Sequence, residues 1–209
     1  MPLLTLPVPL SGTTLVWDPT LDQTGTGGTG TWDVATANWL SAGVDAIWSN
    51  AGGDTAVFQG MGGLVTLATN ITAGGMVFDG PGYSLGGNGS AQVLMLGAGG
   101  ITVSSSGGPI TIGDASLSLQ LAGAQSFSNN STGLLAIAGK VSNGGSLLTL
   151  GSISSGGITL SGGLSGAGGL TINSSGEGVV KLSGSNTYTG ATSVLAGTLK
   201  VGSAIFTRA

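Results

Sequence analysis

The chain contains 209 residues with a net charge of −4, and 6% of its residues are charged, against about 25% in an average soluble domain. It has no histidine and no cysteine, which excludes a histidine base, a cysteine nucleophile and a thiolate zinc site. Only four residues are basic, so no patch can neutralise phosphates and we expect no nucleic-acid partner. Glycine fills 43 positions without a three-residue period, which excludes collagen and predicts many turns.

Residues 1–12 form an apolar lead segment that is interrupted by proline. Its apolar residues alternate with Thr5, Pro7 and Pro9, and they are Leu4, Leu6, Val8 and Leu10. Because proline enters sheets mainly at an edge, we expect an extended edge or donor strand that pairs with another chain, or else a flexible end. The segment lacks the basic start of a signal peptide, and no stretch of the chain has the roughly 18 apolar residues of a transmembrane helix.

Residues 13–60 hold all four tryptophans of the chain, which are Trp17, Trp32, Trp39 and Trp48. Large aromatic side chains fill an irregular core end that short aliphatic strands cannot fill, so this region is predicted to be a cap. A second interpretation stays open, in which Trp17 and Trp32 are exposed and stack on sugars.

Residues 61–209 repeat one short phrase, in which a polar residue stands between two hydrophobic ones and glycine or serine lies close by. Examples are Ile101-Thr102-Val103, Ile110-Thr111-Ile112, Leu148-Thr149-Leu150, Ile158-Thr159-Leu160, Leu170-Thr171-Ile172, Val180-Lys181-Leu182 and Leu199-Lys200-Val201. Alternation with period two indicates strands with one buried face, and the regular spacing predicts an all-β solenoid with almost no helix. Two strands per turn of about 20 residues would give roughly seven rungs and a rod roughly 35 Å long, and three strands per turn would give a shorter rod.

The last strands of this repeat, near Leu199 and Val201, show no evident cap in the sequence. Uncovered end strands present unpaired backbone groups, so we expect these two residues, together with the lead segment, to contact other copies of the chain head to tail.

A more specific pattern lies in the last third of the chain. It consists of Leu-Ser-Gly-x-Asn-Thr-Tyr-Thr-Gly at 182–190, then Thr192 and Val194, then Gly-Thr-Leu-x-Val at 197–201. The pattern resembles the autotransporter-associated β-strand repeat of bacterial surface proteins, and the tryptophan-rich region is similar to segments near the start of such proteins. The resemblance implies a right-handed parallel β-helix that is displayed outside a bacterial cell. Because neither a signal peptide nor an outer-membrane barrel is evident, we expect either a fragment or a stand-alone relative.

No pattern in the sequence supports a catalytic, cofactor or metal site. Residues 25–30 match G-x-G-x-x-G, but neither a hydrophobic strand nor a helix flanks them. The leading hypothesis is therefore a non-enzymatic structural rod for surface display or filament assembly. Two alternatives remain: an adhesive module that binds cell-surface glycans, and a polysaccharide-degrading enzyme that would use carboxylates among the five Asp residues of 13–60.

Overall fold

The computed structural model describes residues 12–202 and 204–208, and within them every regular element is a β-strand. The predicted contacts Leu4, Leu6, Val8 and Leu10 lie outside the described residues. The strands of the first half are β1 (Thr14–Trp17), β2 (Gly30–Trp32), β3 (Trp39–Ser41), β4 (Val44–Ala46), β5 (Thr55–Phe58), β6 (Leu64–Leu67), β7 (Ile71–Phe78), β8 (Ser84–Gly87) and β9 (Gln92–Val103). Those of the second half are β10 (Ile110–Ile112), β11 (Leu117–Leu121), β12 (Gln125–Asn129), β13 (Leu135–Ile137), β14 (Val141–Ser142), β15 (Leu148–Ser152), β16 (Ile158–Leu160), β17 (Leu164–Ser165), β18 (Leu170–Asn173), β19 (Val179–Leu182), β20 (Thr192–Val201) and β21 (Ala204–Arg208).

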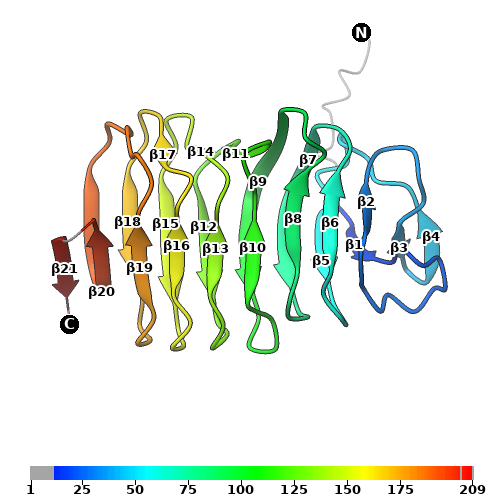
Figure 1. The fold of residues 1–209 in the computed structure, drawn as a ribbon, viewed down its shortest axis with the longest axis horizontal. Coiled ribbons are helices and arrows are strands. Elements are labelled where there is room, and N and C mark those ends of the chain that lie inside the picture. Colours follow the sequence, from blue (N-terminus) through cyan, green and yellow to red (C-terminus); the bar gives the residue numbers. More distant parts are fainter. Residues whose placement is uncertain (1–11, 203, 209) are drawn as a thin grey trace, which may run out of the picture.

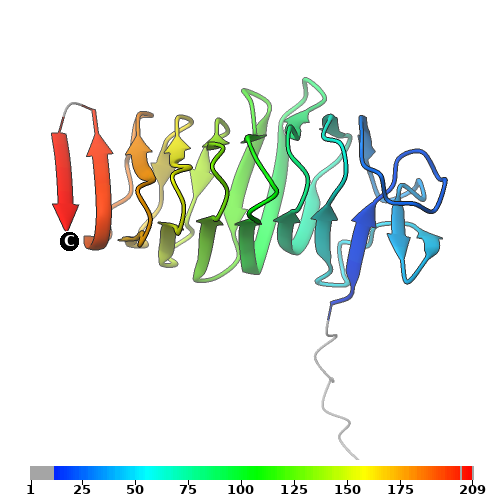
Figure 2. The ribbon, with the colours of Figure 1, turned by 90° about the horizontal axis from the view of Figure 1, so that it is seen from below.

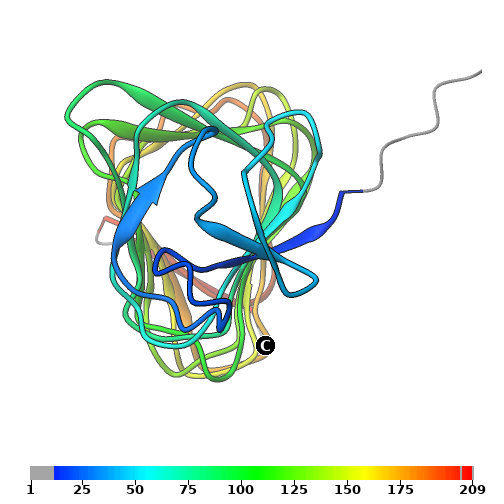
Figure 3. The same ribbon diagram turned by 90° about the vertical axis from the view of Figure 1, so that its right-hand side faces the viewer.

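The strands stack in parallel into a β-solenoid, which confirms the predicted all-β fold (Figures 1 and 2). Face 1 holds β1, β5, β12, β15, β18, the second halves of β7 and β9, and the first half of β20. Face 2 holds β2, β6, β8, β10, β13, β16, β19, the second half of β20, and β21. Face 3 holds the first halves of β7 and β9, then β11, β14 and β17. Seen along the rod, the turns superpose around one interior (Figure 3).

Each turn therefore has three strand positions, which is the second of the two arrangements that the sequence left open. The third position is hard to recognise in the sequence because β14 and β17 are two residues long, too short to show alternation. Elsewhere one long strand serves two faces, as β7 and β9 do on either side of a register shift.

The inward residues of successive turns form continuous apolar columns. On face 1, Ile101, Phe127, Leu150, Ile172 and Val194 stack in register, so a turn takes 22 to 26 residues here. The first four are fully buried. Because each rung buries its apolar side only against its neighbours, the stack is stable as an array and not turn by turn.

Glycine is required where the chain turns a corner close to the next rung. Gly100 has a φ of +60°, and a Cβ placed on it would lie 2.1 Å from the carbonyl oxygen of Ser126. Gly197 has a φ of +85° at the corner that divides β20 between faces 1 and 2. At both positions any other residue would combine a disfavoured backbone conformation with a steric clash.

A tryptophan cluster closes the N-terminal end of the core, as the predicted cap requires. The ring centroids of Trp32 lie 4.9 Å from those of Trp39 and 4.8 Å from those of Trp48, in edge-to-face arrangements. Strand β3 pairs antiparallel with β1 and with β4, and this hairpin covers the first rung of face 1. Parallel pairing begins already at β1 and β2, so the solenoid extends into the 13–60 region.

The opposite end is partly closed, which corrects the expectation that the strands near Leu199 and Val201 are uncapped. Strand β21 turns back and pairs antiparallel with the second half of β20, opposite both residues. The sequence 204–208 carried no glycine-flanked repeat phrase, so only the tertiary arrangement reveals this hairpin.

Candidate functional site

The outer side of face 1 is lined with hydroxyl groups. Alternation in β12, β15 and β18 turns Ser126, Thr149 and Thr171 outward, and the pairing register aligns them in one row that Ser193 continues. Ser128 pairs with Thr102 on the neighbouring rung, beside that row. Since β-branched and small polar residues suit the pleated outer face, the repeat that builds the core also builds this polar surface.

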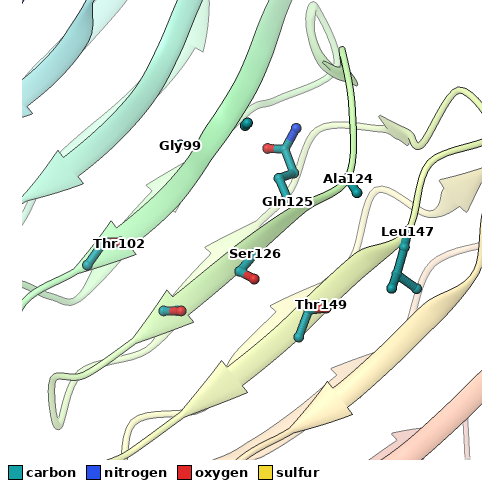
Figure 4. Close-up of a pocket in the computed structure, with 9 residues that line it drawn as sticks. Gly99, Thr102, Ala124, Gln125, Ser126, Leu147 and Thr149 are labelled. Atoms are coloured by element: carbon teal, nitrogen blue, oxygen red, sulfur yellow. The ribbon is translucent and has the colours of Figure 1, made fainter.

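An open groove of about 350 Å³ runs across this surface between β9, β12 and β15. Figure 4 shows its lining side chains, which include Gly99, Thr102, Gln125, Ser126, Leu147 and Thr149. The Leu147 side chain is 45% exposed and supplies an apolar patch at one end. The groove thus combines hydroxyls, an amide and an aliphatic group, which is a neutral surface suited to hydrogen bonding with an uncharged ligand.

Gln125 is the buried polar side chain of this groove, and its amide lies beside Gly99 (Figure 4). Its Nε2 donates to the carbonyl oxygens of Leu96, at 3.0 Å, and Gly123, at 3.4 Å. Its Oε1 has no hydrogen-bond partner among the described residues. A buried acceptor without a partner costs free energy, and this Oε1 is enclosed on the inward side of β12, out of reach of a ligand in the groove.

Four of the five carboxylates of 13–60 accept hydrogen bonds from nearby groups, whereas the buried Oδ1 of Asp45 has no partner among the described residues. Asp33 accepts hydrogen bonds from the backbone N–H groups of Ala35 and Thr36, and Asp54 accepts from the N–H and hydroxyl of Thr13. Burial raises the pKa of Asp33, but the bonds from Thr36 and Ala35 outweigh it and hold that pKa below its ordinary value. No group of three or more acidic side chains that could hold a metal ion occurs within 12–202 and 204–208.

A second, mainly apolar pocket of about 380 Å³ lies at the C-terminal end of the rod. It is lined by Tyr188, Thr192, Val194, Leu199, Val201, Ala204 and Phe206. The side chains of Val201 and Phe206 are 36% and 52% exposed, whereas inward residues of the inner turns are fully buried. The Tyr188 and Thr192 hydroxyls lie 2.6 Å apart and hydrogen-bond at its rim.

The structure brings together only some of the residues singled out from the sequence. Leu199 and Val201 both line the C-terminal pocket, where Leu199 itself is buried. Trp17 and Trp32 are fully buried in the N-terminal cluster, so neither ring is available at the surface to stack on a sugar. The Trp17 indole N–H donates to the carbonyl oxygen of Gly28, as a structural core tryptophan does.

The sequence reasoning missed Gln125, Tyr188 and Phe206. Gln125 stands where the repeat elsewhere places leucine, in register with Leu148 and Leu170, and that break in the column was a usable signal. Phe206 carried no signal, because its place in the pocket depends on the β21 hairpin.

No helix within the described part of the chain is long and apolar enough to cross a membrane. No solved structure matches this chain.

Comparison with known sequences identifies the repeat. The family described as passenger-associated-transport-repeat matches residues 175–201, which cover β19 and β20. The chain is also 36% identical over 138 residues to a protein named adhesin BmaC autotransporter, from Brucella suis biovar 1 (strain 1330). That match covers 63% of this chain and 4% of the adhesin, so the chain spans a small fraction of its relative. The repeat, the solenoid and the relative agree, and the chain is similar to autotransporter passenger-repeat proteins.

Proposed function

We propose that the chain is a non-enzymatic extracellular rod of the bacterial surface that serves adhesion. The observation that carries the proposal is the uniform outer surface of the solenoid, where hydroxyl rows replace the converging charged groups that catalysis needs. Similarity to a protein named as an adhesin supports it.

The groove on face 1 is the proposed contact, and cell-surface glycans are the proposed ligand. Sugars present hydroxyl donors and acceptors on one side of the ring and C–H groups on the other. Ser126 and Thr149 offer matching hydroxyls, and Leu147 offers an apolar contact. The absence of charge around these residues favours neutral glycans over acidic ones.

The test is binding of the purified, fluorescently labelled chain to an array of neutral and sialylated oligosaccharides. Thr149→Arg would fill the groove and remove binding to neutral glycans. Thr159→Arg is the matched control, since Thr159 points outward from β16 on face 2. Circular dichroism confirms that both variants fold. Absence of binding to any glycan, or equal binding by the two variants, refutes the proposed contact.

Self-association of the rod is a second candidate function, because one observation favours it specifically. The C-terminal pocket exposes Val201 and Phe206 at the end of a continuous apolar core. Stacking of a second copy there would bury them and would extend the rod into a filament for surface display. Sedimentation of the full chain over a wide concentration range tests this, and a monomer throughout, with no filaments under the electron microscope, would refute it.

A further inference from the structure

The two main faces of the solenoid end at different levels. Face 2 gains the extra strand β21, while face 1 ends with the first half of β20, Thr192–Ala196. Among the described residues, no strand pairs with the outer edge of Thr192–Ala196. The pocket of about 380 Å³ lies in the step between them. One more strand on face 1 would level the step and cover the pocket.

The pocket continues the core and therefore requires apolar side chains. Val194 ends the column that Phe127, Leu150 and Ile172 form in the inner turns, and it is only partly buried. Phe206, on β21, overhangs the same space from face 2. A strand that places alternate aliphatic side chains over Val194 would bury it as the inner rungs bury Ile172.

The free edge also has a defined hydrogen-bonding pattern. In the inner turns the inward residues direct their N–H groups toward the following rung, as Leu148 does to the carbonyl oxygen of Gly169 and Leu170 does to that of Ala191. Thr192 and Val194 occupy the corresponding inward positions of β20. Their N–H and C=O groups therefore face the open edge, where an added strand would meet them.

The lead segment of the chain carries the complementary pattern. Its residues 4, 6, 8 and 10 are aliphatic, and the positions between them hold Thr5, Pro7 and Pro9. In a strand, alternate residues direct their backbone groups to opposite sides. If these aliphatic residues point into the pocket, an antiparallel strand also directs their N–H groups toward β20. Pro7 and Pro9, which have no N–H, then face away from the pairing edge. A parallel strand would put both prolines against β20 and break the ladder.

The segment must come from a different copy of the chain. Thr13 is held by Asp54 and starts the described fold at the N-terminal end of the rod. Seven strand spacings on face 1 separate β1 from β20, roughly 34 Å at about 4.8 Å each. Eleven extended residues span at most about 40 Å, so a segment that crossed the rod would have almost none left to pair.

We propose that residues 4–10 of one copy add to Thr192–Ala196 of a second copy as an antiparallel strand and fill the C-terminal pocket with their aliphatic side chains. The inference rests on the self-association proposed above and specifies its contact. The prolines leave the new edge without the N–H groups of positions 7 and 9, so each pocket accepts a single strand and the rods join head to tail.

The test compares variants of the full chain by sedimentation velocity. Leu6→Asp combined with Val8→Asp removes the donor side chains, and Thr5→Asp is its control on the opposite side of the strand. Phe206→Asp damages the pocket, and Leu195→Asp is its control, because Leu195 is 56% exposed on β20 and does not line the pocket. We expect the dissociation constant for association to rise at least tenfold in the first member of each pair and to change less than about threefold in the control.

Mixing the two defective variants gives a sharper result. The Phe206→Asp chain keeps its donor segment, and the Leu6→Asp, Val8→Asp chain keeps its pocket. The mixture should form 1:1 dimers and nothing longer, while each variant alone stays monomeric. Circular dichroism establishes that all variants fold.

The backbone pattern is tested with a synthetic peptide of residues 1–11 that competes with association of the full chain. Methylation of the Leu6 nitrogen should weaken competition about tenfold, while methylation of the Thr5 nitrogen should leave it unchanged. Rods that associate regardless of the donor and pocket variants would overturn this contact alone. A full chain that stays monomeric at all concentrations would overturn self-association and the contact with it.

Discussion

Asn143 joins two successive turns of the solenoid, and its replacement by alanine should destabilise the protein strongly. The side chain is fully buried at the end of β14. Its Nδ2 donates to the carbonyl oxygen of Gly168 at 2.8 Å, and its Oδ1 accepts from the N–H of Gly168 at 3.0 Å. Gly168 is itself buried, so Asn143→Ala leaves the N–H and the carbonyl oxygen of Gly168 without these partners.

A buried polar group that loses its partner costs about 1–3 kcal/mol, so two such groups predict a loss of about 2–6 kcal/mol in the free energy of unfolding. For a chain of this size that corresponds to a melting temperature lower by about 4–24 °C. The assay is urea and thermal unfolding followed by circular dichroism. Asn88→Ala is the control, because Asn88 is exposed, so water can replace its bonds to the Ala68 carbonyl oxygen, the Ser90 N–H and the Gln92 amide. The control should lose less than about 1 kcal/mol. Equal losses in the two variants would refute the role assigned to Asn143.

Three further predictions follow from the core and from two titratable groups. Phe127→Ala should lower the free energy of unfolding by about 3–5 kcal/mol, because Phe127 is fully buried between Ile101 and Leu150. Ser128→Ala, on the outer side of the same strand, is the control and should change that free energy little. Similar melting curves for the two variants would contradict the stabilising role of the apolar column. Burial raises the pKa of Asp114, but bonds from Ser116, Leu117 and Gly87 outweigh it and lower that pKa below 3.8. Stability from Asp114 is thus present above about pH 4 and lost as the pH falls further, so Asp114→Asn should flatten the fall in melting temperature between about pH 5 and pH 2, and an unchanged slope would count against it. Burial raises the pKa of Tyr83 to about 12, against a weaker opposing effect of a Gly28 hydrogen bond, so the tyrosinate absorbance should show a component near that pH that disappears in Tyr83→Phe.

The short alternating phrases predicted most of the strands and their inward residues. Ile110-Thr111-Ile112 and Leu148-Thr149-Leu150 have the burial that their pattern indicates, because alternation is a local property that places successive side chains on opposite faces. The tryptophans were predicted to form an N-terminal cap because side chains of their size suit an irregular end of the core.

The candidate surfaces were much harder to predict from the sequence. Leu199 and Val201 were recognised as end residues, but Phe206 and Tyr188 complete their pocket through the β21 hairpin and a chain corner. The face 1 groove likewise needs β9, β12 and β15 in register, although 23 to 26 residues separate their matched positions. Register between rungs depends on how long each corner is, and corner length does not follow from the pattern of any single strand.

By itself, the sequence determined that this protein is all-β and is built from repeated short strands, one unit of which resembles the repeats of passenger proteins, because period-two alternation, dense glycine and the Leu-Ser-Gly-x-Asn-Thr-Tyr-Thr-Gly unit are all local. Only the tertiary structure decided that each turn has three faces, that Asn143 and Gln125 lie inside, and that the C-terminal end is half closed. Those features depend on which residues of successive turns pair with each other, although more than twenty residues of chain separate them. Packing and backbone hydrogen bonding between the turns set that register.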